Sequence, residues 1–139
     1  MEYFLSDDDR MVQRAARSVN YCAEYKSEWI YPFYKRLVKK LTNPPHDALK
    51  RNTLRMFEFM DIPEKHMGEL ADLCFKFLDS ATEPVAVRVF AMSVLLKIVL
   101  VYPELKDELK VMIEDHMPYG SAGFKSRGRK ILKELNKIK

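Results

Sequence analysis

The sequence predicts an all-α protein, a short α-solenoid in which about seven helices stack as pairs with a right-handed superhelical twist. The first observation is a repeat: arginines recur 37, 37 and 39 residues apart, at Arg14, Arg51, Arg88 and Arg127. Such a period is typical of two-helix solenoid repeats. The second is an apolar side chain ten residues before each arginine, and the third is the set of prolines between the expected helices.

The most apolar stretch, residues 84–103, is expected to be a buried helix. Its flanking prolines, Pro84 and Pro103, enclose about eighteen residues, far more than the usual strand of about five or six. Arg88 and Lys97 argue against a membrane span, because charges inside hydrocarbon are costly. In a soluble protein the long stems of both side chains can reach the surface.

Each expected first helix offers an apolar ridge, because side chains four residues apart lie on one helical face. The ridge ends ten residues before each arginine, at Phe4, Leu41, Leu78 and Met117. Stepping back in fours gives Leu37, Phe33 and Trp29, then Cys74, Leu70 and His66, then Ile113, Leu109 and Leu105. The one polar member, His66, is interpreted as a core histidine with a partner at the helix start.

Residues 70–98 show the repeat most completely. An apolar first helix ends in Leu-Asp, a turn carries Pro84, and the second helix opens with Val-Arg at Arg88, followed by Ala91 and Leu95. This pattern resembles the HEAT repeat family, armadillo-like α-solenoids, and the resemblance covers almost the whole chain. It implies a scaffold or partner-binding role, since repeats of this kind carry no activity of their own.

The chain of 139 residues is expected to form one domain. We divide it into a half repeat, 1–25, and repeats at about 26–61, 62–102 and 103–139. The first residues are acidic and lack the apolar run of a signal peptide. Cys22 and Cys74 fall on apolar helical faces and are interpreted as buried thiols, which favours a reducing cytoplasm over a disulfide framework.

The expected turns fall at residues 43–45, 61–63 and 118–120, where prolines break the helical pattern. Helices are expected from about Asp7 to Tyr25, from Leu105 to Met117, and from an N-cap at Ser121 through Ile138. Aromatic residues crowd around the end of the first helix: Tyr21, Tyr25, Trp29, Tyr31, Phe33 and Tyr34. Part of this cluster is expected to cap the first repeat, with a binding hot spot as the alternative.

An enzyme is not expected, because no catalytic or metal-binding motif accompanies the repeat. His46, His66 and His116 share no metal-ligand spacing, and neither a P-loop nor a nucleophile elbow occurs. Residues 120–125 resemble part of the mobile loop of the adenylosuccinate lyase and fumarase superfamily, but the rest of that loop is missing. A relationship to HEAT-like DNA glycosylases is disfavoured because Trp29 falls on a first helix. No cofactor is expected.

The favoured hypothesis is a protein or peptide partner on the face formed by the second helices. If Val87, Ala91, Val94 and Ile98 face the core, other side chains turn outward. The predicted partner-binding residues are Asn52, Arg55, Met56, Phe59, Val89, Met92, Ser93 and Leu96. Methionines and a phenylalanine would form an adaptable groove. The alternative is a shifted register in which these residues are ordinary core.

The second hypothesis is a nucleic acid or other polyanion at the C-terminal end. Residues 118–139 hold seven lysines and arginines against one glutamate, so their charge is +6 and that of the other residues is −2. The predicted polyanion-binding residues are Lys125, Arg129, Lys130, Lys133 and Lys137. A polar outer face that caps the last repeat is the alternative explanation. No membrane partner is expected, and the chain is expected to be a monomer or weak dimer.

Overall fold

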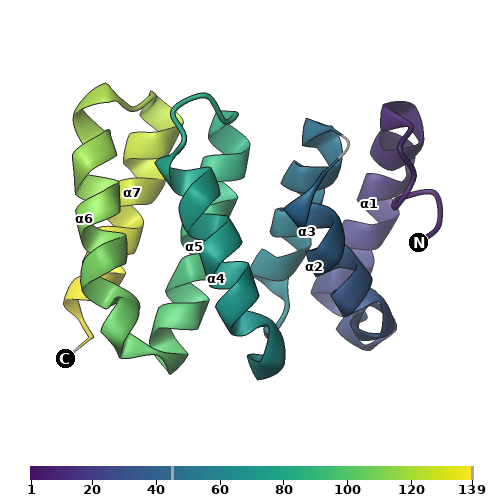
Figure 1. Cartoon of the computed structure of the whole chain (residues 1–139), viewed down its shortest axis with the longest axis horizontal. Coiled ribbons are helices and arrows are strands. Elements are labelled where there is room, and N and C mark those ends of the chain that lie inside the picture. Colours follow the sequence, from purple (N-terminus) through teal and green to yellow (C-terminus); the bar gives the residue numbers. More distant parts are fainter. Residues whose placement is uncertain (45, 139) are drawn as a thin grey trace. The chain divides into compact units, whose positions relative to one another are not determined.

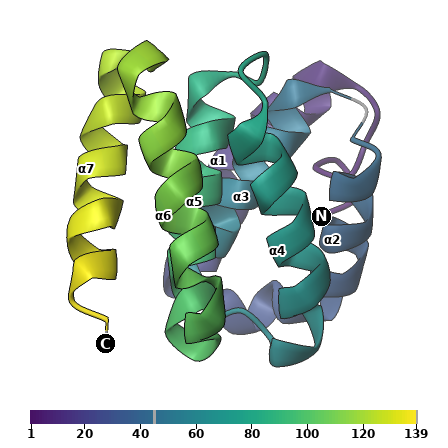
Figure 2. The same cartoon turned by 60° about the vertical axis from the view of Figure 1, so that its left-hand side comes forward.

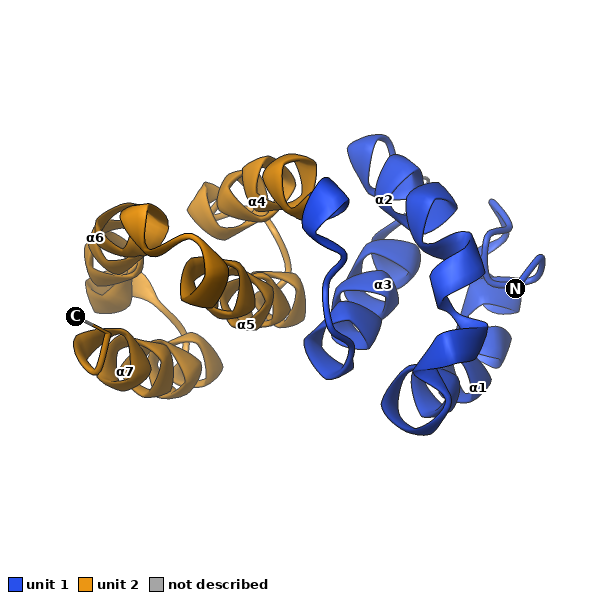
Figure 3. Cartoon of the chain, turned by 90° about the horizontal axis from the view of Figure 1, so that it is seen from below, with its two compact units in different colours: residues 1–66 blue, residues 67–139 orange. Residues whose placement is uncertain are grey.

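The computed structural model describes residues 1–44 and 46–138, so the predicted break at Pro45 lies outside the described residues. Within those residues the chain forms seven α-helices and no strand, which confirms the all-α prediction. Figure 1 labels these helices and colours them along the sequence. The chain divides into two compact units, Met1–His66 and Met67–Lys139 (Figure 3). The expected single domain stays a prediction.

The first unit holds three helices, α1 (Asp9–Tyr25), α2 (Tyr34–Thr42) and α3 (Asp47–Phe59). Two short 3₁₀ turns, Ser27–Trp29 and Tyr31–Phe33, connect α1 to α2. In this unit α1 packs along α3, and α2 lies in a separate layer that contacts α3 (Figure 3). Helix α1 begins at Asp9 because the side chain of Asp8 accepts a hydrogen bond from the Arg10 backbone N–H, as an N-cap does.

The second unit holds α4 (Glu64–Asp79, apart from its first turn), α5 (Val85–Val101), α6 (Lys106–His116) and α7 (Ala122–Asn136). A 3₁₀ turn precedes α6 at Pro103–Leu105, and another precedes α7 at Met117–Tyr119. Within the unit α4 and α6 form one row while α5 and α7 form another (Figure 3). Helices α6 and α7 lie side by side (Figure 2). Each unit has the same arrangement. The first helix of a repeat (α2, α4 or α6) lies in one layer of its unit, and the second helix (α1, α3, α5 or α7) lies in the other.

The boundaries of the apolar helix α5 agree with those predicted from its two prolines. Pro84 is the N-cap, and the backbone N–H of Tyr102, the C-cap residue, donates to the Ile98 carbonyl. Ser121 caps α7, as predicted, with its hydroxyl oxygen accepting from the Phe124 N–H at 3.2 Å. The capping of α3 falls to His46, whose Nδ1 accepts from the Leu49 N–H at 3.2 Å.

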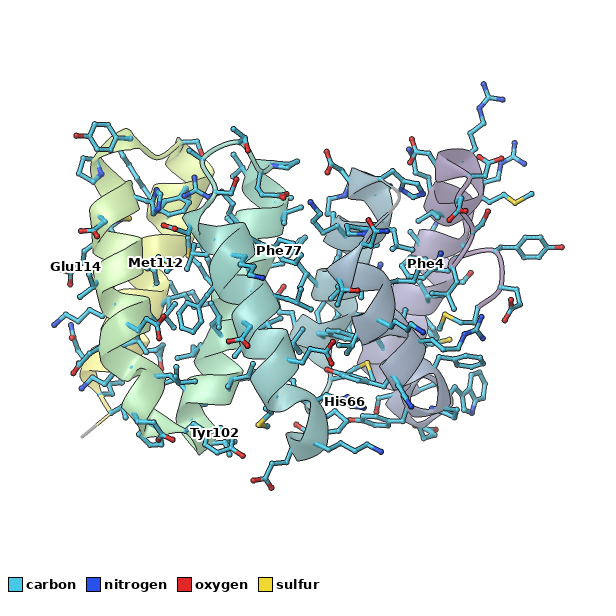
Figure 4. The ribbon with its side chains drawn as sticks, in the orientation of Figure 1. Phe4, His66, Phe77, Tyr102, Met112 and Glu114 are labelled. Carbon is cyan, nitrogen blue, oxygen red and sulfur yellow. The ribbon has the colours of Figure 1, made fainter. Side chains whose placement is uncertain are left out.

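Aromatic stacking fills the core of the first unit. Tyr34 is buried, and its ring stacks on Phe57 with centroids 4.3 Å apart. His66 stacks on the same tyrosine at 5.4 Å, so it is half-buried at the start of α4 (Figure 4). This agrees with its interpretation as a structural histidine. Part of the aromatic cluster thus packs within the first unit.

Arg88 ties three helices of the second unit together. Its guanidinium donates from Nε and Nη2 to the Leu78 carbonyl at the end of α4, at 3.0 and 2.9 Å. The same group lies 4.4 Å from the ring centroid of Phe124 in α7, a cation–π contact. Burial lowers the pKa of Arg88, which the nearby Asp79 carboxylate opposes. The arginine nevertheless stays charged, because its ordinary pKa lies so far above neutrality.

The four repeat arginines lie in the first two turns of their helices but do not share one environment. Arg88 is buried and Arg127 is half-buried, whereas Arg14 and Arg51 are exposed. Arg127 donates to the hydroxyl of Ser93 on α5. The repeat predicts equivalent places for the four arginines, and their unequal exposure contradicts that prediction; Arg88 is enclosed by the Leu78 carbonyl and the Phe124 ring.

Gly68 offers a simple test of helix α4. Gly68 is an interior residue of the helix but is exposed to solvent, and a methyl group added at its Cα would meet nothing within 4 Å. Gly68→Ala should therefore raise the free energy of unfolding by about 0.5–1 kcal/mol, because alanine loses less backbone entropy in a helix. Chemical denaturation followed by circular dichroism measures the change. A loss of stability would contradict the described surroundings of Gly68.

A candidate partner-binding groove

A groove of about 420 Å³ runs between the second helices α1 and α3 of the first unit. From α3 it is lined by Asn52, Arg55 and Phe59. From α1 it is lined by Gln13, Ala16, Arg17, Asn20, Tyr21 and Glu24. These positions recur every three or four residues, which is the spacing that places side chains on one face of a helix.

The floor of the groove is a pair of buried amides. Asn20 Nδ2 donates to the Ala16 carbonyl at 2.9 Å and to Asn52 Oδ1 at 3.1 Å, while Asn52 Nδ2 donates to the Ala48 carbonyl at 2.9 Å. Asn20 Oδ1 accepts no hydrogen bond from the residues that the structure describes. A buried acceptor without a donor costs about 1–3 kcal/mol, so this oxygen favours an incoming N–H group.

The walls of the groove combine arginine with aromatic side chains. The Arg55 guanidinium carbon lies 5.9 Å from the ring centroid of Phe59, which is 39 % exposed. Arg17 faces them from α1 and is exposed too. Among the described residues neither arginine has an ion-pair partner. Two cationic forks are thus available to a ligand at neutral pH.

Arginines extend along both helices beyond the groove itself. Arg10 and Arg14 precede Arg17 on α1 by seven and three residues, and Arg51 precedes Arg55 by four on α3. All five are exposed. Spacings of three and four keep each set on one side of its helix. The second-helix face of the first unit is therefore cationic as well as aromatic.

Three exposed aromatics lie at the C-terminal end of α1 and in the 3₁₀ turn that follows it. The rings of Tyr21 and Tyr25 are 4.9 Å apart, and Lys26 Nζ lies 5.9 Å from the ring centroid of Trp29. All three aromatic residues are about three-fifths exposed. The predicted aromatic cluster thus splits into a buried part, centred on Tyr34, and an exposed part next to the groove.

The predicted partner-binding residues differ in exposure. On α3, Arg55 and Phe59 are exposed, but Met56 is fully buried and Asn52 is 8 % exposed. On α5, Met92 is also fully buried, whereas the other three are half-buried: Val89, Ser93 and Leu96. The predicted methionine groove is therefore wrong.

Its error lies in the assumed faces of the two helices. Buried residues occupy most of the circumference of α3, and its exposed residues are Asp47, Arg51, Arg55 and Phe59. The apolar side chains of α5 are spread around its circumference, so its sequence does not indicate which side faces solvent. The core positions predicted for α5 are confirmed as buried: Val87, Ala91, Val94 and Ile98.

The basic helix α7 has the predicted amphipathic pattern. Phe124, Ile131 and Leu135 are buried. Of the predicted polyanion-binding residues, Lys125 is half-buried and the others are exposed: Arg129, Lys130, Lys133 and Lys137. Lys137 pairs with Glu134 at 3.1 Å. Both a solvated cap and a polyanion surface agree with this geometry, so polyanion binding stays a prediction.

The histidine and cysteine side chains of the second unit have neighbours that favour a structural role. His116 Nε2 lies 3.0 Å from Asp79 Oδ1, while the neighbouring Glu114 projects from α6 into solvent (Figure 4). Burial raises the pKa of the Cys74 thiol, which makes it a poor nucleophile at neutral pH, and Cys22 is half-buried. Residues 1–44 and 46–138 contain no group of three or more potential metal ligands.

Among the described residues, no helix has both the length and the apolar character that a membrane span requires. A family model of the HEAT repeat domain matches residues 2–135. Neither the curated proteins nor the solved structures gave a match. The family match spans both compact units and all seven helices described above.

Proposed function

The chain belongs to the HEAT repeat family, and from that premise we propose that it is a scaffold that binds a partner protein on its second-helix face. HEAT repeats suggest a protein-interaction role in general. The proposal is more specific, because it assigns the contact surface to the groove between α1 and α3. Solenoids use such faces, since neighbouring helices form one extended surface.

The groove itself is the observation that carries this proposal. It combines Phe59 and Tyr21, which offer apolar contact area, with Arg17 and Arg55, which offer hydrogen-bond donors. Aromatic residues and arginine are enriched among the side chains that dominate binding at protein interfaces. The groove also lies on packed helices rather than on loops, so few backbone degrees of freedom are lost when a partner binds.

An unbiased peptide-display library tests the proposed function. Selection on the wild-type chain should enrich peptides that bind with micromolar or tighter affinity. Phe59→Ala should weaken the binding of these peptides by about tenfold or more, because a central aromatic contact is lost. Fluorescence anisotropy with the synthetic peptides measures the change.

Tyr119→Ala is the matched control. Tyr119 is 90 % exposed and precedes α7, so it offers an aromatic side chain that does not line the groove. Its replacement should change affinity by less than about twofold. The proposed function fails if selection enriches no peptide, or if the selected peptides bind wild type and Phe59→Ala equally well.

A further inference from the structure

We infer that the groove between α1 and α3 takes an acidic peptide segment, in which a carboxylate binds Arg17 and Arg55 and a neighbouring apolar side chain packs on Phe59. The inference rests on the proposed function and adds the chemical class of the partner. It follows from four properties of the groove: its charge, the charge around it, its unpartnered acceptor and its aromatic wall.

The charge of the groove favours a carboxylate. Its charged lining residues are Arg17 on one wall, Arg55 on the other, and Glu24. The two arginines have no ion-pair partner among the described residues, so a ligand carboxylate would displace only water from them. Arginine presents parallel N–H donors that match the two oxygens of a carboxylate. The contact of Arg55 with Phe59 also restricts the guanidinium before a ligand arrives.

The surroundings of the groove have the same sign. Arg10, Arg14 and Arg51 add three exposed cations along the two helices. Of the carboxylates near the N-terminal ends of these helices, Asp7 pairs with Lys40 at 3.2 Å and Asp47 lies 3.7 Å from Lys50 Nζ, whereas the hydrogen bond of Asp9 with Gln13 leaves its charge in place. A positive potential over this face would attract an acidic segment and speed its association.

The floor of the groove favours a peptide rather than a small anion. Asn20 is 9 % exposed, lines the groove, and has an Oδ1 that accepts from none of the described residues. This oxygen is buried, so it reaches a donor in the groove only when the Asn20 side chain moves and gives up its bonds to Ala16 and Asn52. A peptide chain brings such a donor at every non-proline residue, whereas a free carboxylate or phosphate ion is chiefly an acceptor.

Glu24 argues against nucleic acid as the preferred occupant, although the aromatic wall alone would also accept a stacked base. Phosphate groups recur along a nucleic-acid strand, so a strand that follows the groove would place negative charge beside Glu24 as well as beside the arginines. A peptide can place its carboxylate at the arginines and an apolar side chain at Phe59 and Tyr21. Only the peptide therefore satisfies the whole lining.

The test uses the same unbiased peptide library on the full chain and on a double variant, Arg17→Gln with Arg55→Gln. Peptides selected on wild type should be enriched in aspartate or glutamate next to an aromatic or aliphatic residue. For the strongest binder, exchange of its acidic residues for Gln or Asn should weaken binding to wild type by about tenfold, because a charge-assisted pair is lost. The same exchange should change binding to the double variant by less than about twofold.

Arg129→Gln with Lys133→Gln is the matched control, since it removes the same charge from exposed positions of α7. It should leave the acidic preference intact. Circular dichroism confirms that both double variants keep their helices. A labelled single-stranded RNA and a labelled DNA duplex are titrated at low and moderate salt in parallel.

The outcomes separate the two proposals. If selected peptides depend on Phe59 but bind equally well with glutamine in place of glutamate, the proposed function stands and the acidic partner is wrong. If the acidic preference persists in the Arg17, Arg55 variant, the assigned arginines are wrong. If RNA or DNA binds tightly through these arginines while acidic peptides do not bind, the occupant is nucleic acid and the inference is overturned.

Discussion

Phe57→Ala should lower the free energy of unfolding by about 3–5 kcal/mol, the largest effect expected for the first unit. Phe57 is fully buried on α3, and its ring stacks on Tyr34 with centroids 4.3 Å apart. Alanine would remove this contact and leave a cavity that the packed helices α2 and α3 can fill only in part. Urea denaturation followed by far-ultraviolet circular dichroism measures the loss.

Phe59→Ala provides the control for this prediction on the same helix. Phe59 is 39 % exposed at the edge of the groove, so its removal should cost less than about 1 kcal/mol. The two variants separate core packing from groove contacts: Phe57→Ala should lower stability, whereas Phe59→Ala should lower peptide affinity. Equal losses for the two variants would contradict the described packing of Phe57.

Arg88→Met should lower the free energy of unfolding by about 3 kcal/mol, through lost charged hydrogen bonds and a lost cation–π contact. Methionine fills much of the same space but leaves the buried Leu78 carbonyl without the two donors that it has in the wild type. It also removes the positive charge over Phe124. The expected result is a shifted denaturation midpoint with the helical content kept.

Arg51→Met is the control one repeat earlier. Arg51 is exposed, so its replacement should change the free energy of unfolding by no more than about 0.5 kcal/mol. A larger loss for Arg88→Met than for Arg51→Met would show that Arg88 stabilises the fold because it is enclosed, and not because it occupies a repeat position. Similar effects at the two positions would favour a role common to every repeat arginine.

The helix boundaries could be predicted from the sequence because they depend on local chemistry. Pro84 and Pro103 restrict the backbone wherever they occur, and the Ser121 hydroxyl can cap any helix that begins beside it. The N-cap of α3 is local too, because His46 Nδ1 accepts from the Leu49 N–H three residues later. Signals of this kind lie within a few residues of their effect.

The outward faces of the helices could not be predicted, because they depend on neighbours. Helix α5 is apolar on every side, so Met92 carries no mark that distinguishes a core position from a surface one. The same holds for Met56, since most of the circumference of α3 is buried. Their burial follows from packing that a period of 3.6 residues does not specify.

The groove was found in part. The predicted residues Asn52, Arg55 and Phe59 line it from α3. The opposite wall on α1 is not predicted, because the repeat is aligned on arginines 37 residues apart, whereas Asn20 and Asn52, which meet on the floor, are 32 apart. One signal was present in the sequence: Gln13, Arg17, Asn20 and Glu24 recur at helical spacing. Polar residues at such spacing suggest a solvated face, and only the packing of α1 on α3 makes them a groove.

The exposure of Trp29 determines what its fluorescence can report about this protein. It is the only tryptophan, and 61 % of its side chain is accessible to water, with Lys26 over the ring. Its fluorescence in the folded chain should already resemble that of an indole in water, so unfolding will shift the emission little. The same exposure leaves the emission free to move to shorter wavelength when something covers the end of α1.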